Sequence, residues 1–169
     1  MEENYKDEMI VIDNVNRYNE IFGLETKHPL VSIIDLTKST TWPTRAWFRY
    51  EVYALFLKNV KCGDIKYGRQ YYDYQDGTIV CFGPGQITDL ELIQNIQPNA
   101  HGLLFHPDLI RGTSLGQEIK NYSFFSYETN EALHLSEEER QIVMDCLQKI
   151  VIELNHAIDR HSRRLICTC

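Results

Sequence analysis

The chain has 169 residues, which suits one domain with a hydrophobic core, and 43% of them are hydrophobic, as in ordinary globular proteins. Its formal net charge of −7 argues against direct DNA binding, which needs a basic face. No apolar run approaches the roughly 20 residues that span a bilayer, and no signal-peptide pattern opens the chain. We therefore expect a cytoplasmic protein without membrane contact.

The five cysteines give no sign of a metal site or a disulfide framework. They are Cys62, Cys81, Cys146, Cys167 and Cys169, and no two of them form a C-x-x-C pair. Their odd number and irregular spacing fit a reducing compartment.

The first 28 residues are polar and acidic, and they predict an N-terminal arm with one short helix over Val11–Ile21. The character then changes, because Leu30–Leu36 is rich in β-branched residues and reads as a strand. Tyr50–Leu57 is apolar on nearly both faces and predicts a buried strand. Between these strands we expect a loop, in which aromatic and basic residues form a lid, a partner surface or simply a packed turn. Its members are Trp42, Pro43, Arg45 and Trp47.

The segment from Cys62 to Gln86 predicts tight antiparallel hairpins of a small β-barrel. Its three apolar or aromatic runs are Ile65–Tyr67, Tyr71–Tyr74 and Ile79–Phe82. Gly68 and the Gln75-Asp76-Gly77 turn separate them, and glycine reaches the positive φ that such turns require.

After a polar stretch over Thr88–Asn99, the chain predicts alternating short elements. Ala100–Phe105 reads as a strand, and Asp108 is expected to cap a short helical turn. A second short helix is expected from Ser114 to Lys120, and a final strand over Tyr122–Glu128.

The last element is a long amphipathic helix, expected over residues 137–161. Ser136 and Glu139 have the spacing of a capping box, in which each side chain satisfies a backbone donor of the other. An apolar stripe follows at helical spacing: Ile142, Val143, Cys146, Leu147, Ile150, Val151, Leu154 and Ile158. The stripe either packs against the barrel or forms a dimer seam, or does both. Ile152 lies on the opposite side, which favours a second contact surface.

The run Gly77–Gln86 resembles the second conserved motif of cupins: a glycine, an apolar strand and a Pro-Gly turn. Together with FHPDLIRGTSLG and LHLSEEERQ, the run Tyr53–Gln86 is similar to the N-terminal half of AraC-type (AraC/XylS) transcription regulators. The phrases KCGDIKYGRQYYDYQDG and LLFHPDLIRGTSLG look especially like the regulators of this family in gut-type anaerobic bacteria. The resemblance covers roughly residues 22–165.

This resemblance implies a mostly β fold with a C-terminal α part. It implies an arm over residues 1–28, a cupin-like jelly-roll barrel that senses an effector over 29–130, and a helical homodimerisation segment over 131–169. In the family, a half with helix-turn-helix motifs follows and reads DNA. That half is missing here, so we expect DNA contact only through an absent domain, the chain being a fragment or a truncated regulator.

A metal or other cofactor is not expected, because the metal ligands of cupins are replaced. In metal-binding cupins, two histidines and a glutamate of the first motif and a third histidine of the second motif hold the metal. The third histidine would stand near Thr88, and the first motif would fall over Asp64–Tyr72, which holds no histidine or glutamate. No nucleophile elbow, phosphate loop or dinucleotide fingerprint occurs either. We therefore expect no enzymatic activity.

If the barrel binds an effector, aromatic faces suit a sugar ring and a guanidinium suits a small carboxylate. The candidate effector-binding residues are Trp47, Tyr53, Tyr67, Arg69, Tyr71 and Tyr72. About half of these must face outward, because side chains alternate along a strand. The candidate dimer-interface residues are Cys146, Ile150, Leu154 and Ile158.

Three hypotheses remain open at this point. The first is an effector-sensing and dimerising domain of an AraC-type regulator, which a filled barrel interior would weaken. The second is a ligand-free dimerisation or interaction domain. The third is a metal-free cupin-type enzyme, which would need two of Asp64, Lys66, Arg69 and Asp73 to converge on one cavity.

Overall fold

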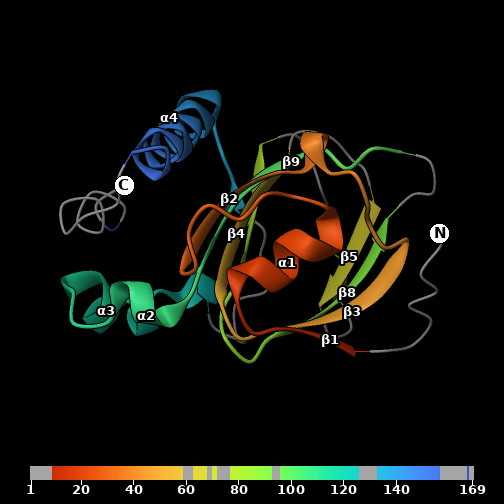
Figure 1. The fold of residues 1–169 in the computed structure, drawn as a ribbon, viewed down its shortest axis with the longest axis horizontal. Helices are drawn as coiled ribbons and strands as arrows, with labels where there is room; N and C mark the ends of the chain where they lie inside the picture. Colours follow the sequence, from red (N-terminus) through yellow and green to blue (C-terminus); the bar gives the residue numbers. More distant parts are fainter. Residues whose placement is uncertain are drawn as a thin grey trace.

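The computed structural model describes residues 9–58, 63–67, 70–71, 77–92, 96–125, 133–156 and 167, with only the backbone described at 63–67 and 70–71. Two five-stranded sheets face each other, with helix α1 between them (Figure 1). Every strand pair is antiparallel except the parallel pair of β1 with β3. The expected mostly β fold with a C-terminal helix is thus confirmed as two mostly antiparallel sheets followed by α4.

The first sheet has the order β1 (Met9–Ile12), β3 (Arg45–Tyr50), β8 (Ile87–Leu92), β5 (Gly63–Tyr67) and β6 (Gln70–Tyr71). The second has the order β10 (Leu133–His134), β7 (Thr78–Phe82), β4 (Tyr53–Lys58), β9 (Ala100–Phe105) and β2 (Val31–Asp35). The α-helices are α1 (Val15–Phe22), α2 (Pro107–Ile110), α3 (Ser114–Glu118) and α4 (Glu137–Leu154). Three short 3₁₀ helices are η1 (Leu36–Lys38), η2 (Ile119–Asn121) and η3 (Ser123–Phe125).

Three strands of the first sheet, β1, β3 and β8, were not expected from the sequence. Strand β3 replaces part of the predicted aromatic-basic loop, because Ala46, Phe48 and Tyr50 alternate inward while Arg45 and Trp47 point outward. Strand β8 lies in the stretch predicted to be polar and irregular. Its polar residues Thr88 and Asp89 are buried in the sheet, so the sequence pattern concealed a strand.

The Cys62–Gln86 segment contributes to both sheets. Strands β5 and β6 pair with each other in the first sheet, whereas β7 lies between β10 and β4 in the second. The strands expected over Ile65–Tyr67 and Ile79–Phe82 are therefore present, but they belong to different sheets, and only Tyr71 of the run Tyr71–Tyr74 is described. Gly77 has φ 79°, as a turn glycine does, and residues 72–76 lie outside the described part.

Helix α1 confirms the short helix expected near the N-terminus, although it begins at Val15 rather than Val11, and it belongs to the core. Asn14 caps its start by accepting a hydrogen bond from the backbone N–H of Arg17, and Gly23 ends it at φ 62°. Strand β1 pairs with β3 at the edge of the first sheet. Helix α1 follows β1 directly in the chain and therefore lies in the space between the sheets (Figure 1).

The C-terminal elements match the sequence in part. Ser136 and Glu139 form the predicted capping box, and α4 is described to Leu154, while residues 157–161 of the predicted helix lie outside the described part. His106, rather than Asp108, caps α2, since its Nδ1 accepts from the backbone N–H of Asp108 at 3.1 Å. The predicted Tyr122–Glu128 strand is wrong: its described part contains the 3₁₀ helix η3.

The physical reason lies in how Phe125 is held. Its ring packs edge-on against Tyr53, and its carbonyl accepts a hydrogen bond from the Gln86 side chain at 3.1 Å. These contacts anchor η3 against the second sheet.

Candidate functional site

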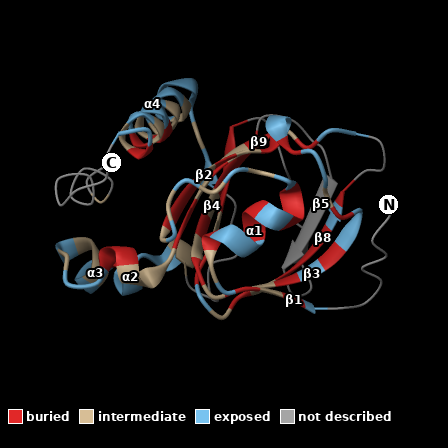
Figure 2. Cartoon of the chain, in the orientation of Figure 1, coloured by how far each residue is buried: buried red, intermediate tan, exposed pale blue. Residues whose placement is uncertain are grey.

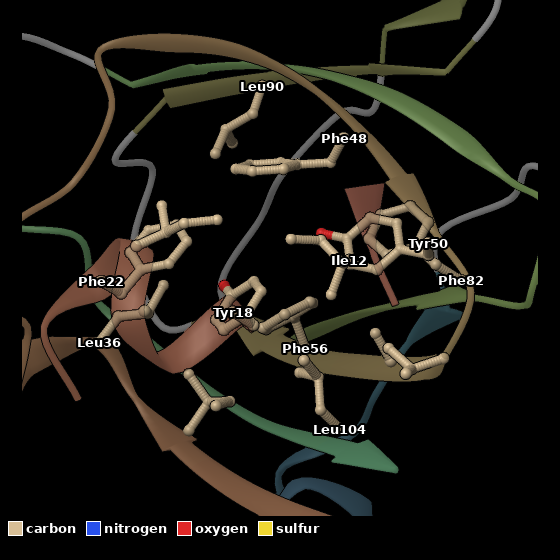
Figure 3. Packing of buried hydrophobic residues seen from close by; sticks show 14 of the residues in the cluster. Ile12, Tyr18, Phe22, Leu36, Phe48, Tyr50, Phe56, Phe82, Leu90 and Leu104 are labelled. Atoms are coloured by element: carbon tan, nitrogen blue, oxygen red, sulfur yellow. The ribbon is translucent and has the colours of Figure 1, made fainter. Parts of the chain in front are cut away.

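The space between the sheets is filled by aromatic side chains of the chain itself (Figure 3). From α1, Tyr18 stacks on Phe22 with ring centroids 4.6 Å apart and lies 5.7 Å from Phe56. Tyr50 and Phe82, from opposite sheets, stack at 5.1 Å. All five side chains are buried, so the region in which an effector was expected holds packed rings.

A buried polar network fixes α1 in this position. The Asn19 side-chain amide donates to Thr26 Oγ1 at 2.8 Å and to Ser32 Oγ at 3.0 Å, and its oxygen accepts from the Ser32 hydroxyl. It also donates to the Glu25 carbonyl at 3.3 Å. Burial raises the pKa of Tyr18, with a further contribution from nearby Tyr50. The interior is therefore a desolvated core, and the buried side-chain amide of Asn19 has its hydrogen bonds satisfied.

The predicted effector-binding residues are not gathered in this interior. Trp47 points outward and is 39% exposed. Tyr53 lies on the outer face of the second sheet, where it stacks on Phe105 at 5.0 Å. Strand alternation explains both positions, since Phe48 and Phe56 take the inward places. Tyr67 and Tyr71 lie on β5 and β6, whose side chains are not described, and Arg69 and Tyr72 lie outside the described residues.

Helix α4 covers part of the outer face of the second sheet (Figures 1 and 2). Its buried residues Leu147, Ile150 and Leu154 face the chain itself. Two of them, Ile150 and Leu154, pack in one cluster with Val31 and Phe105. These two predicted interface residues are thus covered within one chain. Of the other two candidates, Cys146 is half-buried and Ile158 lies outside the described residues.

The outward side of α4 carries a second apolar and charged stripe, which we call the outer stripe: Ile142, Asp145, Lys149 and Ile152. Ile142 is 57% and Ile152 49% exposed. The spacing i, i+3, i+7, i+10 places all four on one side of the helix. The sequence identified Ile152 as part of a second surface but assigned Ile142 to the buried stripe.

A half-open groove of about 440 Å³ lies between α4, β2 and the segment that follows α1. Its apolar walls come from β2 and α4 and include Val31, Ile33, Val151 and Leu154. Glu25 and Lys27 also line it, and Lys27 Nζ donates to Asn155 Oδ1 at 2.6 Å. No sequence pattern pointed to this groove, because its walls are brought together only by the docking of α4.

Asp35 lies in the groove lining with Lys38 and His101. Its carboxylate accepts from the Thr37 hydroxyl at 2.6 Å and pairs with Lys38 Nζ at 3.0 Å, and His101 Nε2 lies 3.6 Å away. Burial raises the pKa of Asp35, but the hydrogen bonds from Thr37 and Lys38 and the charges of His101 and Lys38 outweigh it. The pKa therefore lies below its ordinary value of 3.8.

Within the described residues, no group of three or more histidine, cysteine or acidic side chains could hold a metal ion. In the same part of the chain, every helix is too short or too polar to cross a membrane. The chain matches no protein-family model and no curated protein.

Proposed function

We propose that this chain is the dimerising regulatory half of an AraC-type transcription regulator, and that its two sheets form the jelly-roll of that family. DNA would be read by a helix-turn-helix half of the same regulator. The net charge of −7 supports a role other than direct DNA binding. The order of elements, with two sheets followed by a capped amphipathic helix, agrees with the sequence resemblance.

The observation that carries this proposal is the self-complementarity of the outer stripe. In two antiparallel copies of α4 related by a two-fold axis at the level of Leu147, Ile142 lies opposite the partner's Ile152. Asp145 then lies opposite the partner's Lys149, and the symmetry repeats each pair. One patch therefore supplies two apolar contacts and two opposite-charge contacts to a copy of itself.

Neither charge of the stripe has an ionic partner in its own chain among the described residues. Asp145 accepts a hydrogen bond from the neutral amide of Gln141 at 2.8 Å. Lys149 lies one helical turn after Asp145, but the two do not form an ion pair within the chain. Both are therefore available to a second molecule. The buried face of α4 anchors the helix, so the stripe is presented on a fixed support.

A ligand-free dimerisation domain is the second candidate, and the filled interior favours it. Effector binding between the sheets would require the rings of Tyr18 and Phe22 to leave the core. The metal-free enzyme hypothesis has less support, because Arg69 and Asp73 lie outside the described residues and the side chains of Asp64 and Lys66 are not described.

A charge swap tests the proposal. Light scattering should give twice the 19.8 kDa of one chain. Lys149→Asp places like charges opposite each other twice and should weaken dimerisation about tenfold or more. The double variant Asp145→Lys, Lys149→Asp restores both pairs and should recover the dimer.

Gln117→Glu on α3 is the control, since it changes charge on an exposed residue away from the stripe. A monomeric wild type, or a double variant as weak as the single one, would refute pairing through this stripe.

A further inference from the structure

The groove beneath α4 joins an aliphatic cavity to two charges of opposite sign. Its described lining contains no phenylalanine, tyrosine or tryptophan, and its volume of about 440 Å³ lies in the range of small-ligand sites. Val31 and Leu154 belong to one packed cluster, and Lys27 bonds to Asn155, so these residues mark one end of the groove. Asp35, His101 and Lys38 mark the other end.

The two ends differ in the charge they offer to a ligand. At the Asp35 end, the carboxylate is already neutralised by Lys38 and satisfied by Thr37. At the Leu154 end, Glu25 and Lys27 are exposed, and neither has an ionic partner among the described residues. An unpaired carboxylate and an unpaired ammonium therefore stand two residues apart at the mouth of an apolar cavity.

The backbone of Glu25 and the ammonium of Lys27 are held in position by the rest of the fold. The Glu25 carbonyl accepts a hydrogen bond from the buried Asn19 side chain, which fixes the backbone there. Lys27 is held by the amide of Asn155, just past the end of α4. A ligand at this end would thus contact the segment after α1 and the end of α4 at once.

From this arrangement we propose that the groove binds a free aliphatic α-amino acid of the leucine, isoleucine and valine class. Its ammonium pairs with Glu25, its carboxylate pairs with Lys27, and its side chain lies against Ile33, Val151 and Leu154. A ligand with both charges on one carbon matches the neighbouring charges of Glu25 and Lys27, and an aliphatic side chain matches the aliphatic walls at this end of the groove. The site would couple such a ligand to α4, and in this respect it rests on the proposed dimerising function.

The test is a titration of the wild-type chain with leucine by calorimetry and thermal melting. At 100 times the Kd, leucine should raise the melting temperature by about 5 °C or more. Two analogues dissect the charges: 4-methylpentanoate lacks the ammonium, and 3-methylbutylamine lacks the carboxylate. Each should bind at least about tenfold more weakly, because one of the two charges at the groove mouth is left unpaired.

Matched variants locate the site. Glu25→Gln and Lys27→Gln should each weaken leucine binding about tenfold, and both are exposed, so the fold is preserved. Gln148→Trp should block the groove that Gln148 lines, whereas Gln117→Trp, an exposed change on α3, should leave binding unaltered. Absence of leucine binding, an affinity for either analogue as high as that for leucine, or full binding by Gln148→Trp would overturn the proposal.

The mass of the same samples separates the two proposals. A dimer that ignores leucine refutes this site alone, while a monomer that binds leucine through Glu25 and Lys27 refutes the dimer alone.

Discussion

The two faces of the second sheet are built from the same strands but differ in how completely they are covered. On the inner face, Phe56 and Leu104 meet aromatic rings from the first sheet and from α1, and the space is filled. On the outer face, Ile33, Leu55 and Leu103 remain half-buried beneath partial helical cover. The inner face is therefore closed by packing within the chain, whereas the outer face is only partly covered and is the face on which both proposed contacts lie.

Helix α1 is the cause of this asymmetry. It contributes Val15, Tyr18 and Phe22 to the interior, and its one buried amide, Asn19, is fully engaged. Helix α4 buries a single face and leaves a groove on one side and the outer stripe on the other. Both proposed contacts, with a ligand and with a second copy, therefore lie at α4 rather than between the sheets.

The largest effect is expected from Phe22→Ala. Phe22 is 1% exposed and stacks on Tyr18, so its loss leaves a cavity and should lower the free energy of unfolding by about 3–5 kcal/mol. Urea unfolding measures this change. Tyr122→Ala removes an exposed ring outside the core and should cost less than about 1 kcal/mol. Equal losses for the two variants would remove the contrast between the faces.

Gly102→Ala asks whether the interior can accept a single methyl group. A Cβ there would lie 2.6 Å from the Phe56 ring and 2.7 Å from the Leu55 carbonyl oxygen. We expect a loss of about 1–3 kcal/mol in urea unfolding, because overpacking forces the surroundings to shift. Full tolerance of this alanine would mean that the space between the sheets is loosely packed.

Ser136→Ala addresses α4, where the effect should be smaller. The change removes the capping box that Ser136 forms with Glu139, at a cost of about 1 kcal/mol in the free energy of unfolding. Ser114→Ala is the comparison, since Ser114 is an exposed first-turn residue whose helix is capped by Thr113. A cost as large for Ser114→Ala would argue against the cap as the cause.

The smallest effect concerns pH and the groove. Because the pKa of Asp35 is lowered in the folded state, its carboxylate stabilises the fold above its ordinary value of 3.8, and this contribution is lost as pH falls through the lower, folded pKa. Asp35→Asn should therefore reduce stability by at most about 1 kcal/mol at pH 7. The difference from wild type should shrink below pH 3.8, and urea unfolding at several pH values would detect a difference that grows instead.

Local signals in the sequence were sufficient for the elements that depend on near neighbours. The capping box of Ser136 and Glu139 was predictable because its partners are three residues apart. Strands β2 and β9 were predictable because their β-branched or apolar runs end at clear breaks.

Features that depend on distant pairing were not predictable. The burial of α1 follows from the pairing of β1 with β3, in which Met9 meets Trp47, and no local pattern encodes that contact. The groove likewise requires α4 to dock beside β2. The outer stripe could have been predicted, because its charges and its isoleucines are placed symmetrically about Leu147 in the sequence. The helix periodicity alone, however, assigned Ile142 to the buried stripe.

Native-state hydrogen exchange of α1 tests the central claim most directly, because it reports whether the interior opens. We predict that the protected amides of Val15–Phe22 exchange only through global unfolding, with the same free energy as those of β4 and β9. Exchange of α1 through a separate, lower-energy opening would contradict this account. Helix α1 could then leave the interior without global unfolding, and an effector could bind between the sheets.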